Sequence, residues 1–351
     1  MDLDLNMTAY PWESKTLYTL RLIEQWFLPF LWLFAIYFAF SLSRTFLVHK
    51  NLRILLSLCA PSILVSTTSH NIFIYVIKWA ENRQQHWTTE FVYCTVAFTH
   101  LTSSAFAGLI LFGVVLERLR ASVKNQNYES SGIKFGIILC AQSLVSSVLL
   151  SLYVIVYDMW TIDQTNPFYK YRYSFELHPS LGVICYGSAA VSTSLSVLLM
   201  CRLYKRNKML RLRTRGCVPL ALRYQYNENV HSLRTLIPLI CMYGACTVVG
   251  SVLVILREIR FNLTGPTDIQ QMIYLQLVYL SMDMFVFVGV PFMFVSYSPL
   301  KHLLFSDIQR LVGQETSQVR VVTNERFYQK HAPPINETTD IYFEHLRHSW
   351  R

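Results

Sequence analysis

Charged side chains are scarce in this chain of 351 residues, where they make up 15% of the composition while hydrophobic residues make up 53%. Soluble proteins carry roughly 25% charged residues, so a soluble globule of this size would lack polar surface. The same composition excludes an intrinsically disordered chain, which needs low hydrophobicity and high charge. A mean hydropathy of +0.32 agrees with both exclusions. The composition therefore indicates a membrane protein, provided that the apolar residues are gathered in runs of membrane length.

Catalytic motifs are also missing. The chain has no Gly-x-Ser-x-Gly elbow, no His-Glu-x-x-His pair, no P-loop, no Rossmann fingerprint and no zinc-ligand spacing. Asp283 is the only acid that interrupts a long apolar run, whereas an intramembrane aspartyl enzyme needs paired acids. We therefore expect no enzyme activity, no cofactor and no metal site. The eight cysteines lie mostly inside apolar runs and do not form the pattern of a disulfide framework.

Apolar residues are gathered in seven long runs that are almost free of charge. A membrane-spanning helix needs about 20 apolar residues, and lipid admits only helices or closed barrels. The runs lack the strict alternation of barrel strands. The sequence therefore predicts an all-α membrane protein, a seven-transmembrane helix bundle. The expected spans are 25–43, 54–77, 91–116, 135–157, 177–201, 235–256 and 269–297.

The distribution of cations predicts the orientation of the bundle. Cytoplasmic segments of membrane proteins carry an excess of lysine and arginine, and most of the 31 such residues here fall on the side of the C-terminus. We therefore expect the N-terminus outside and the C-terminus in the cytoplasm. The net charge of +10 is then a signature of topology rather than of nucleic-acid binding.

The segments outside the spans are predicted as follows. Residues 1–24 form an extracellular tail with a glycosylation sequon at Asn6 and no cleavable signal peptide. Residues 25–305 form the transmembrane domain. Leucine and isoleucine recur at helical spacing within 299–311, which predicts a short amphipathic helix on the inner leaflet. The polar residues 312–351 are expected to be a disordered cytoplasmic tail.

Polar side chains inside the apolar runs are candidate ligand contacts. Asp283 stands near the middle of the seventh run, where a charge costs about 2.5–3.5 kcal/mol on insertion scales. It is either a hydrogen-bonded packing residue, or a ligand counter-charge, a cation site or a proton-linked switch. His100 lies about two to three turns from the outer end of the third run, a depth that suits a pocket. Interhelical hydrogen bonding is the default role of such groups. The candidate ligand contacts are His100, Asp283, His70, Asn71, Thr99, Ser103 and Gln276.

Adjacent Glu117 and Arg118 close the third run at the inner side. The pair either marks the boundary of the span or acts as a latch, in which Glu117 neutralises Arg118 at rest and Arg118 reaches a partner when the helices part. The segment after the fifth run is strongly basic. It either anchors the orientation against anionic lipid or extends the fifth helix toward a signalling partner, and the two roles are compatible.

Three short strings resemble a known family. They are His49-Lys50-Asn51-Leu52, Glu117-Arg118-Leu119-Arg120-Ala121 followed by Asn127-Tyr128-Glu129, and Leu222-Arg223-Tyr224-Gln225-Tyr226-Asn227-Glu228-Asn229. With these strings the chain resembles the nematode serpentine receptors of the chemosensory type. Class epsilon is the most similar, and classes alpha-beta and alpha are close alternatives. The similarity covers roughly residues 20–305.

This resemblance implies a G-protein-coupled chemosensory receptor in the plasma membrane of sensory neurons, in their cilia. Its partners would be a small-molecule ligand bound among the second, third, fifth, sixth and seventh helices, a heterotrimeric G protein and the lipid bilayer. Leu119 replaces the aromatic residue of the Asp/Glu-Arg-Tyr motif that rhodopsin-like receptors carry. The expected G-protein contacts are Glu117, Arg118, Arg202, Lys205, Arg206, Arg223, Tyr224, Gln225, Glu228 and Asn229.

Two other functional classes stay open at this point. A seven-span ligand-gated channel or transporter would carry a current or a substrate without any G protein, although no filter loop or charged ring is visible in the sequence. A receptor-like partner subunit with no ligand is the third possibility.

Overall fold

The computed structural model describes residues 14–45, 49–81, 87–123, 132–161, 179–213, 220–264 and 269–312. All regular secondary structure within these ranges is helical. The helices are α1 (Lys15–Arg44), α2 (Lys50–Glu81), α3 (Trp87–Val123), α4 (Lys134–Thr161), α6 (Pro179–Arg213), α7 (Leu220–Thr264), α8 (Ile269–Ser296) and α9 (Ser298–Leu311). The tail that contains Asn6 and the residues after Val312 lie outside the described ranges.

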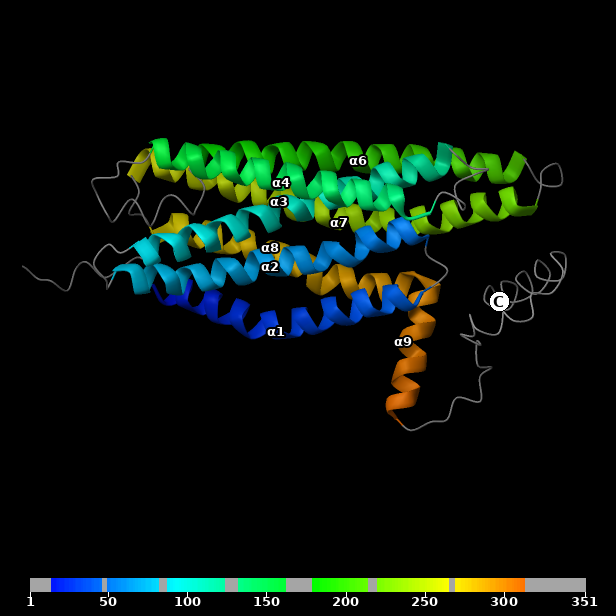
Figure 1. The fold of residues 1–351 in the computed structure, drawn as a ribbon, viewed down its shortest axis with the longest axis horizontal. Coiled ribbons are helices and arrows are strands. Elements are labelled where there is room, and N and C mark those ends of the chain that lie inside the picture. Colours follow the sequence, from blue (N-terminus) through cyan, green and yellow to red (C-terminus); the bar gives the residue numbers. More distant parts are fainter. Residues whose placement is uncertain are drawn as a thin grey trace, which may run out of the picture. The chain divides into compact units, whose positions relative to one another are not determined.

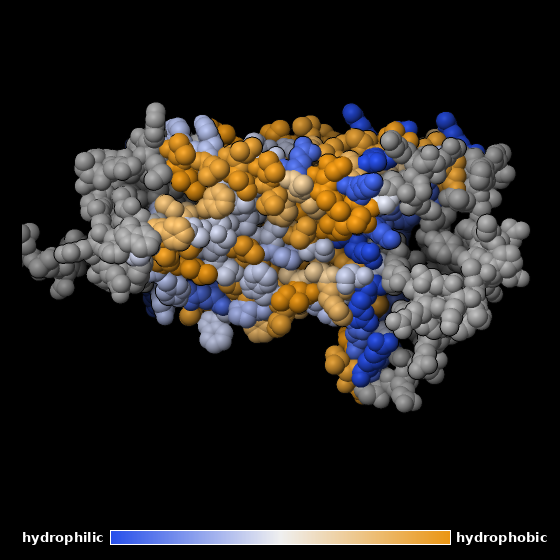
Figure 2. Space-filling view, in the orientation of Figure 1, coloured by the Kyte–Doolittle hydropathy of each residue, from blue (hydrophilic) through white to orange (hydrophobic). Residues whose placement is uncertain are grey.

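Seven of these helices, all except α9, are long and apolar enough to cross a membrane. This confirms the predicted seven-helix bundle. Figure 1 shows these helices side by side, with α6 along α7, α2 along α3, and α1 beside both α2 and α8. Large apolar side chains such as Leu33, Leu149 and Val295 are exposed on the outside of the bundle, as expected of surfaces in contact with lipid tails. Figure 2 shows an apolar band over the side of the bundle, with hydrophilic residues gathered toward one end of it.

Most helices are longer than the apolar runs that predicted them. α3 continues to Val123, α6 to Arg213, and α7 begins at Leu220, well before the run at 235–256. The reason is that a helix satisfies its own backbone hydrogen bonds and can therefore extend beyond the lipid into water. The difference matters most in α1, which begins at Lys15. Residues 15–24 belong to this helix and not to a separate tail.

Small residues allow the helices to approach closely. A Cβ atom at Gly250 of α7 would lie 3.1 Å from the Tyr186 ring of α6, and one at Gly244 would lie 3.1 Å from Thr193 Cγ2. Association of helices in lipid relies on such close packing because apolar burial alone supplies little driving force there. The two glycines thus explain why α6 and α7 lie against each other along their length.

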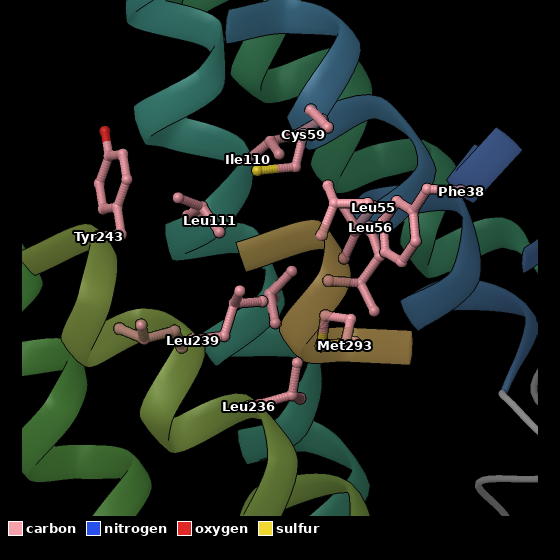
Figure 3. Close-up of a cluster of buried hydrophobic side chains, with 14 of the residues drawn as sticks. Phe38, Leu55, Leu56, Cys59, Ile110, Leu111, Leu236, Leu239, Tyr243 and Met293 are labelled. Carbon is pink, nitrogen blue, oxygen red and sulfur yellow. The ribbon is translucent and has the colours of Figure 1, made fainter. Parts of the chain in front are cut away.

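The apolar core takes buried residues from every helix given above, from α1 to α9. Figure 3 shows Leu55 of α2, Ile110 of α3, Leu239 of α7 and Met293 of α8 turned toward one another. On α3 the core residues, from Ala107 to Val115, lie between His100 and Arg118. The core therefore separates two polar sites, one toward each end of the bundle.

Candidate functional site

Polar side chains from four helices form one buried group toward the end of the bundle that charge predicts to face outward. We call this group the outer polar cluster. All of its members are buried. They are Glu24 of α1, Ser66, Thr67, His70 and Asn71 of α2, His100 of α3, and Gln276, Tyr279 and Asp283 of α8.

Two carboxylates in the cluster are each held by a neutral donor from another helix. Thr67 Oγ1 donates to Asp283 Oδ1 at 2.8 Å, and Gln276 Nε2 donates to Glu24 Oε2. Asn71 Nδ2 donates to the backbone oxygen of Thr67 at 3.1 Å. These bonds connect α8 with both α1 and α2. They also show that Asp283 contacts α2 directly, across 216 positions of sequence.

His100 links α3 to α2 and α8. Its Nδ1 lies 2.9 Å from the backbone oxygen of Ser66. Because a carbonyl oxygen only accepts, Nδ1 carries a proton and donates, and Nε2 accepts from the Tyr279 hydroxyl at 2.9 Å. The neutral ring with its proton on Nδ1 can make both bonds. His70 stacks on the same tyrosine, with ring centroids 3.8 Å apart.

The structure brings together five of the seven ligand contacts expected from the sequence, namely His100, Asp283, His70, Asn71 and Gln276. The other two do not join them. Thr99 is exposed, and its hydroxyl donates to its own helix at Thr95 O. Ser103 likewise donates to Thr99 O and His100 O. A helix turns about 100° per residue, so Thr99, directly before His100, faces another direction. Ser103 lies on nearly the same face as His100, but its hydroxyl is bonded to its own helix.

The position of the cluster also differs from the expectation. The sequence suggested a pocket among the second, third, fifth, sixth and seventh helices, whereas the cluster joins the first, second, third and seventh, which are α1, α2, α3 and α8. The difference arises from Glu24. Sequence reasoning counted it in the outer tail and recognised one membrane acid, but Glu24 is fully buried in α1. The outer polar cluster therefore contains a pair of buried acids.

The sequence contains only weak signals for Glu24 and Tyr279, two residues of the cluster that were not among the expected ligand contacts. The buried face of α1 includes a stripe of residues spaced seven apart, namely Leu17, Glu24, Leu31 and Phe38. Because the other three residues of the stripe are apolar, the spacing predicts that Glu24 is buried as well. Tyr279 lies three residues after Gln276, on one face of α8. Neither spacing says which distant helix faces these residues.

A second polar site lies at the other end of the bundle, which charge predicts to be cytoplasmic. We call Glu117, Arg118 and Ser232 the arginine latch. Glu117 and Arg118 are buried at the end of α3. Arg118 Nε donates to Glu117 Oε2 at 2.5 Å, and Nη2 donates to Oε1 at 2.9 Å. Arg118 Nη1 donates to Ser232 Oγ of α7 at 3.0 Å. The two charges thus neutralise each other while the guanidinium holds α7 against α3.

Further hydrogen bonds hold the same end together. Asn229 Nδ2 of α7 donates to Ala121 O of α3 at 3.4 Å. Asn207 Nδ2 of α6 donates to Ser122 Oγ of α3 at 2.9 Å. The end of α3 is therefore tied to both α6 and α7, so its arginine is covered by the helices that surround it.

His49 lies beside the latch, just before α2. Its Nδ1 accepts from the backbone N–H of Asn51 at 3.3 Å and lies 3.7 Å from Glu117 Oε1. Burial, followed by the positive charge of Arg118, lowers the pKa of His49 to about 4. The ring is therefore neutral at pH 7, and the Glu117 charge remains available to Arg118.

The remaining residues expected to contact a G protein fall into three groups. Arg202, Lys205 and Arg206 are exposed on α6. Gln225 and Asn229 are buried, and Glu228 is partly buried, on α7. Arg223 and Tyr224 belong to α7, but their side chains lie outside the described part of the structure. The exposed and the buried residues therefore do not form one surface in this conformation.

Comparison with known proteins identifies the family. A family model described as serpentine type 7TM GPCR receptor class ab chemoreceptor matches residues 6–272, which is more than half of the chain. The class is one of the close alternatives expected from the sequence, and the match does not confirm class epsilon. No curated protein matches the chain. The matched family is one of receptors and not of enzymes.

Proposed function

Because the chain belongs to the class ab family of serpentine seven-helix chemoreceptors, we propose that it binds a small molecule from outside the cell and signals to a heterotrimeric G protein inside. Family membership and seven spanning helices make it a multi-pass membrane receptor. In this proposal the N-terminus is outside, and the receptor acts in the plasma membrane of sensory neurons, in their cilia. The ligand enters at the outer polar cluster.

The observation that carries the proposal is the arginine latch. Burying an ion pair costs several kcal/mol per ion in desolvation, and apolar residues of similar size would often stabilise the fold at least as well. Arg118 is 1% exposed and held by Glu117 and Ser232. A buried arginine that contributes little to stability is consistent with a role for Arg118 in a second, open conformation of the bundle. When the end of α7 moves away from α3, Arg118 is uncovered for the G protein.

A single helix connects the ligand end to this latch. α3 carries His100 in the outer polar cluster and Arg118 in the latch, 18 residues apart, which is about 27 Å at ~1.5 Å per residue. A ligand that changes the contacts of His100 can bias the position of α3. It does so only if it binds the open state more tightly than the closed one.

In this proposal, exposed cations on α6 form part of the surface that binds the G protein. Arg202, Lys205 and Arg206 project from the helix next to the latch, and α6 and α3 are joined there through Asn207 and Ser122. Opening of the bundle at this end would bring Arg118 and these cations onto one face. The same cations also suit anionic lipid when the partner is absent.

The proposal is tested by measuring basal nucleotide exchange on G proteins in membranes that carry the receptor. Ser232→Ala removes one hydrogen bond between α3 and α7. We expect it to raise basal exchange about threefold, because interhelical hydrogen bonds in membranes contribute roughly 0.6 kcal/mol. Arg118→Ala should abolish exchange at matched surface level. Ser251→Ala is the matched control. Ser251 also lies on α7, and its hydroxyl donates to Tyr186 O of α6 and to Thr247 O of its own helix, away from the latch.

The opposite results would contradict the proposal. If Arg118→Ala exchanges nucleotide as well as the wild type, or if Ser251→Ala raises exchange as much as Ser232→Ala, the latch does not control coupling. A ligand-dependent current or uptake that persists without any G protein would establish the channel or transporter alternative.

A further inference from the structure

The two acids of the outer polar cluster each have one oxygen bonded and one oxygen free. Glu24 Oε2 accepts from Gln276 and Asp283 Oδ1 accepts from Thr67. Glu24 Oε1, Asp283 Oδ2 and Asn71 Oδ1 have no hydrogen-bond partner within the described chain. The three residues are 0%, 3% and 5% exposed. Three helices therefore each contribute one unsatisfied oxygen acceptor that is shielded from bulk water.

These three residues are neighbours. The Asn71 side chain lies within hydrogen-bonding reach of the Glu24 carboxylate, and Glu24 and Asp283 interact electrostatically. Gln276, which holds Glu24, lies seven residues before Asp283 on α8, so the two side chains face the same way. The bonds Gln276 to Glu24 and Thr67 to Asp283 then fix the two carboxylates in one region between α1, α2 and α8.

The two acids have one cation near them within the described residues. Arg21, three residues before Glu24 on α1, is the cation that interacts with Glu24. Asp283 has no cation among its electrostatic partners within the described residues. The other titratable groups of the cluster are His70 of α2, His100 of α3 and Tyr279 of α8. Within the described residues one cation therefore faces two acids, and a buried acid is normally paired with a cation or kept neutral by a proton.

The missing partner can be described from these acceptors. It must be positively charged, must donate hydrogen bonds and must be small enough for a buried site. An ammonium group has one positive charge, three N–H donors and no acceptor, which matches three free oxygens of which two belong to acids. A single proton shared between the two carboxyl groups would satisfy two of these oxygens and would leave Asn71 Oδ1 without a donor. A bare metal ion prefers six or more oxygen ligands when the ion is hard, as calcium and magnesium are.

We propose that Glu24, Asn71 and Asp283 bind the ammonium group of a small protonated amine. This inference rests on the proposed function, because it names the chemical class of the ligand that the receptor detects. The amine nitrogen donates to Glu24 Oε1, Asn71 Oδ1 and Asp283 Oδ2, and the stacked rings of His70 and Tyr279 lie next to it. Binding ties α1, α2 and α8 together, and Tyr279 passes the change to His100 on α3.

The test is thermal unfolding of the purified full-length receptor in lipid nanodiscs, at fixed pH and ionic strength. The probes are methylammonium chloride, tetramethylammonium chloride and sodium chloride. Methylammonium should raise the unfolding temperature with saturation, because a ligand that binds only the folded state stabilises it by mass action. Tetramethylammonium, which has no N–H donor, and sodium should not. No G protein is needed, so a failure here leaves the coupling test of the receptor unaffected.

Neutral isosteres locate the site. Glu24→Gln and Asp283→Asn should each require about tenfold more methylammonium for the same shift, because hydrogen bonds to a charged group are roughly twice as strong as neutral ones. Asp307→Asn is the control, since it makes the same chemical change on α9. Asn71→Leu is a further variant that leaves both acids in place and removes the third acceptor, and its response should also be weaker.

Several outcomes would overturn the inference. Equal shifts with methylammonium and sodium would show a metal-ion or salt effect. Equal shifts with tetramethylammonium would show that N–H donors are not recognised. A stability that changes with pH but not with methylammonium would assign the pair to proton binding. Wild-type responses from Glu24→Gln, Asp283→Asn and Asn71→Leu would place any amine effect elsewhere in the molecule.

Discussion

At the scale of single residues, polar side chains are tolerated inside this bundle because their partners come from other helices. The imidazole of His100 uses both nitrogens, one toward Ser66 of α2 and one toward Tyr279 of α8. A buried polar group without such a partner costs free energy comparable to a lost hydrogen bond or more. His100 therefore has a structural role that holds three helices together, and its place in the outer polar cluster gives it the signalling role proposed above.

Tyr279→Phe tests the structural role. The change removes the hydroxyl that donates to His100 Nε2 and leaves the ring that stacks on His70. We expect the free energy of unfolding to fall by about 1–2 kcal/mol, because a buried acceptor loses its donor. Tyr274→Phe makes the same change on α8 at a hydroxyl that has no hydrogen bond within the described chain. Thermal unfolding in nanodiscs measures the stability of both variants. If Tyr279→Phe is as stable as Tyr274→Phe, the proposed structural role of His100 is wrong.

At the scale of helices, close approaches are specified by individual side chains. α4 begins at Lys134, so the backbone N–H of Gly136 is one of the first N–H groups of the helix, which have no partner within it. Asn51 of α2 fills this gap, because its Oδ1 accepts from Gly136 N at 3.0 Å. A Cβ at position 136 would lie 3.0 Å from both Asn51 Cα and Oδ1. The start of α4 is thereby fixed against the start of α2.

Gly136→Ala should therefore push α4 away from α2. Overpacking costs typically about 1–3 kcal/mol, and the better helix propensity of alanine returns up to ~1 kcal/mol, so a net destabilisation of about 1–2 kcal/mol is expected. Gly187→Ala on α6 is the matched control, since nothing lies within 4 Å of a Cβ there. It should be neutral or stabilising. The unfolding temperature and the amount of receptor at the cell surface are measured for both variants. If Gly136→Ala is as stable as the wild type, the close contact between Gly136 and Asn51 is wrong.

At the scale of the whole molecule, charge and hydropathy act on the chain as a unit. Seven helices are apolar enough to span a membrane, and the face of the bundle in Figure 2 carries an apolar band. The cations that give the net charge of +10 are concentrated in segments on the side of the C-terminus. Because positively charged loops are retained in the cytoplasm during insertion, this asymmetry predicts which end faces outward. In the proposed function the outer polar cluster then lies on the ligand side and the arginine latch on the G-protein side.

This orientation predicts the accessibility of the termini. An epitope placed before Met1 should be stained by antibody on intact cells, whereas one placed after Arg351 should be stained only after permeabilisation. Asn6→Gln should remove a glycan that is detected as a mobility shift after glycosidase treatment. The reverse staining pattern would invert the bundle and would place the arginine latch on the outside, which excludes its proposed coupling role.

The sequence by itself determined the membrane class and the number of spans, because lipid leaves so few ways to bury a polar backbone that seven apolar runs admit one fold class. It also pointed to Asp283, His100 and Arg118, since polar residues stand out against an apolar background. The tertiary structure alone decided which of these groups meet. Glu24 and Gln276 are 252 positions apart, and Arg118 and Ser232 are 114 apart. Such contacts depend on how each helix is rotated in the bundle, which is set by the packing of all seven helices together and not by any local pattern.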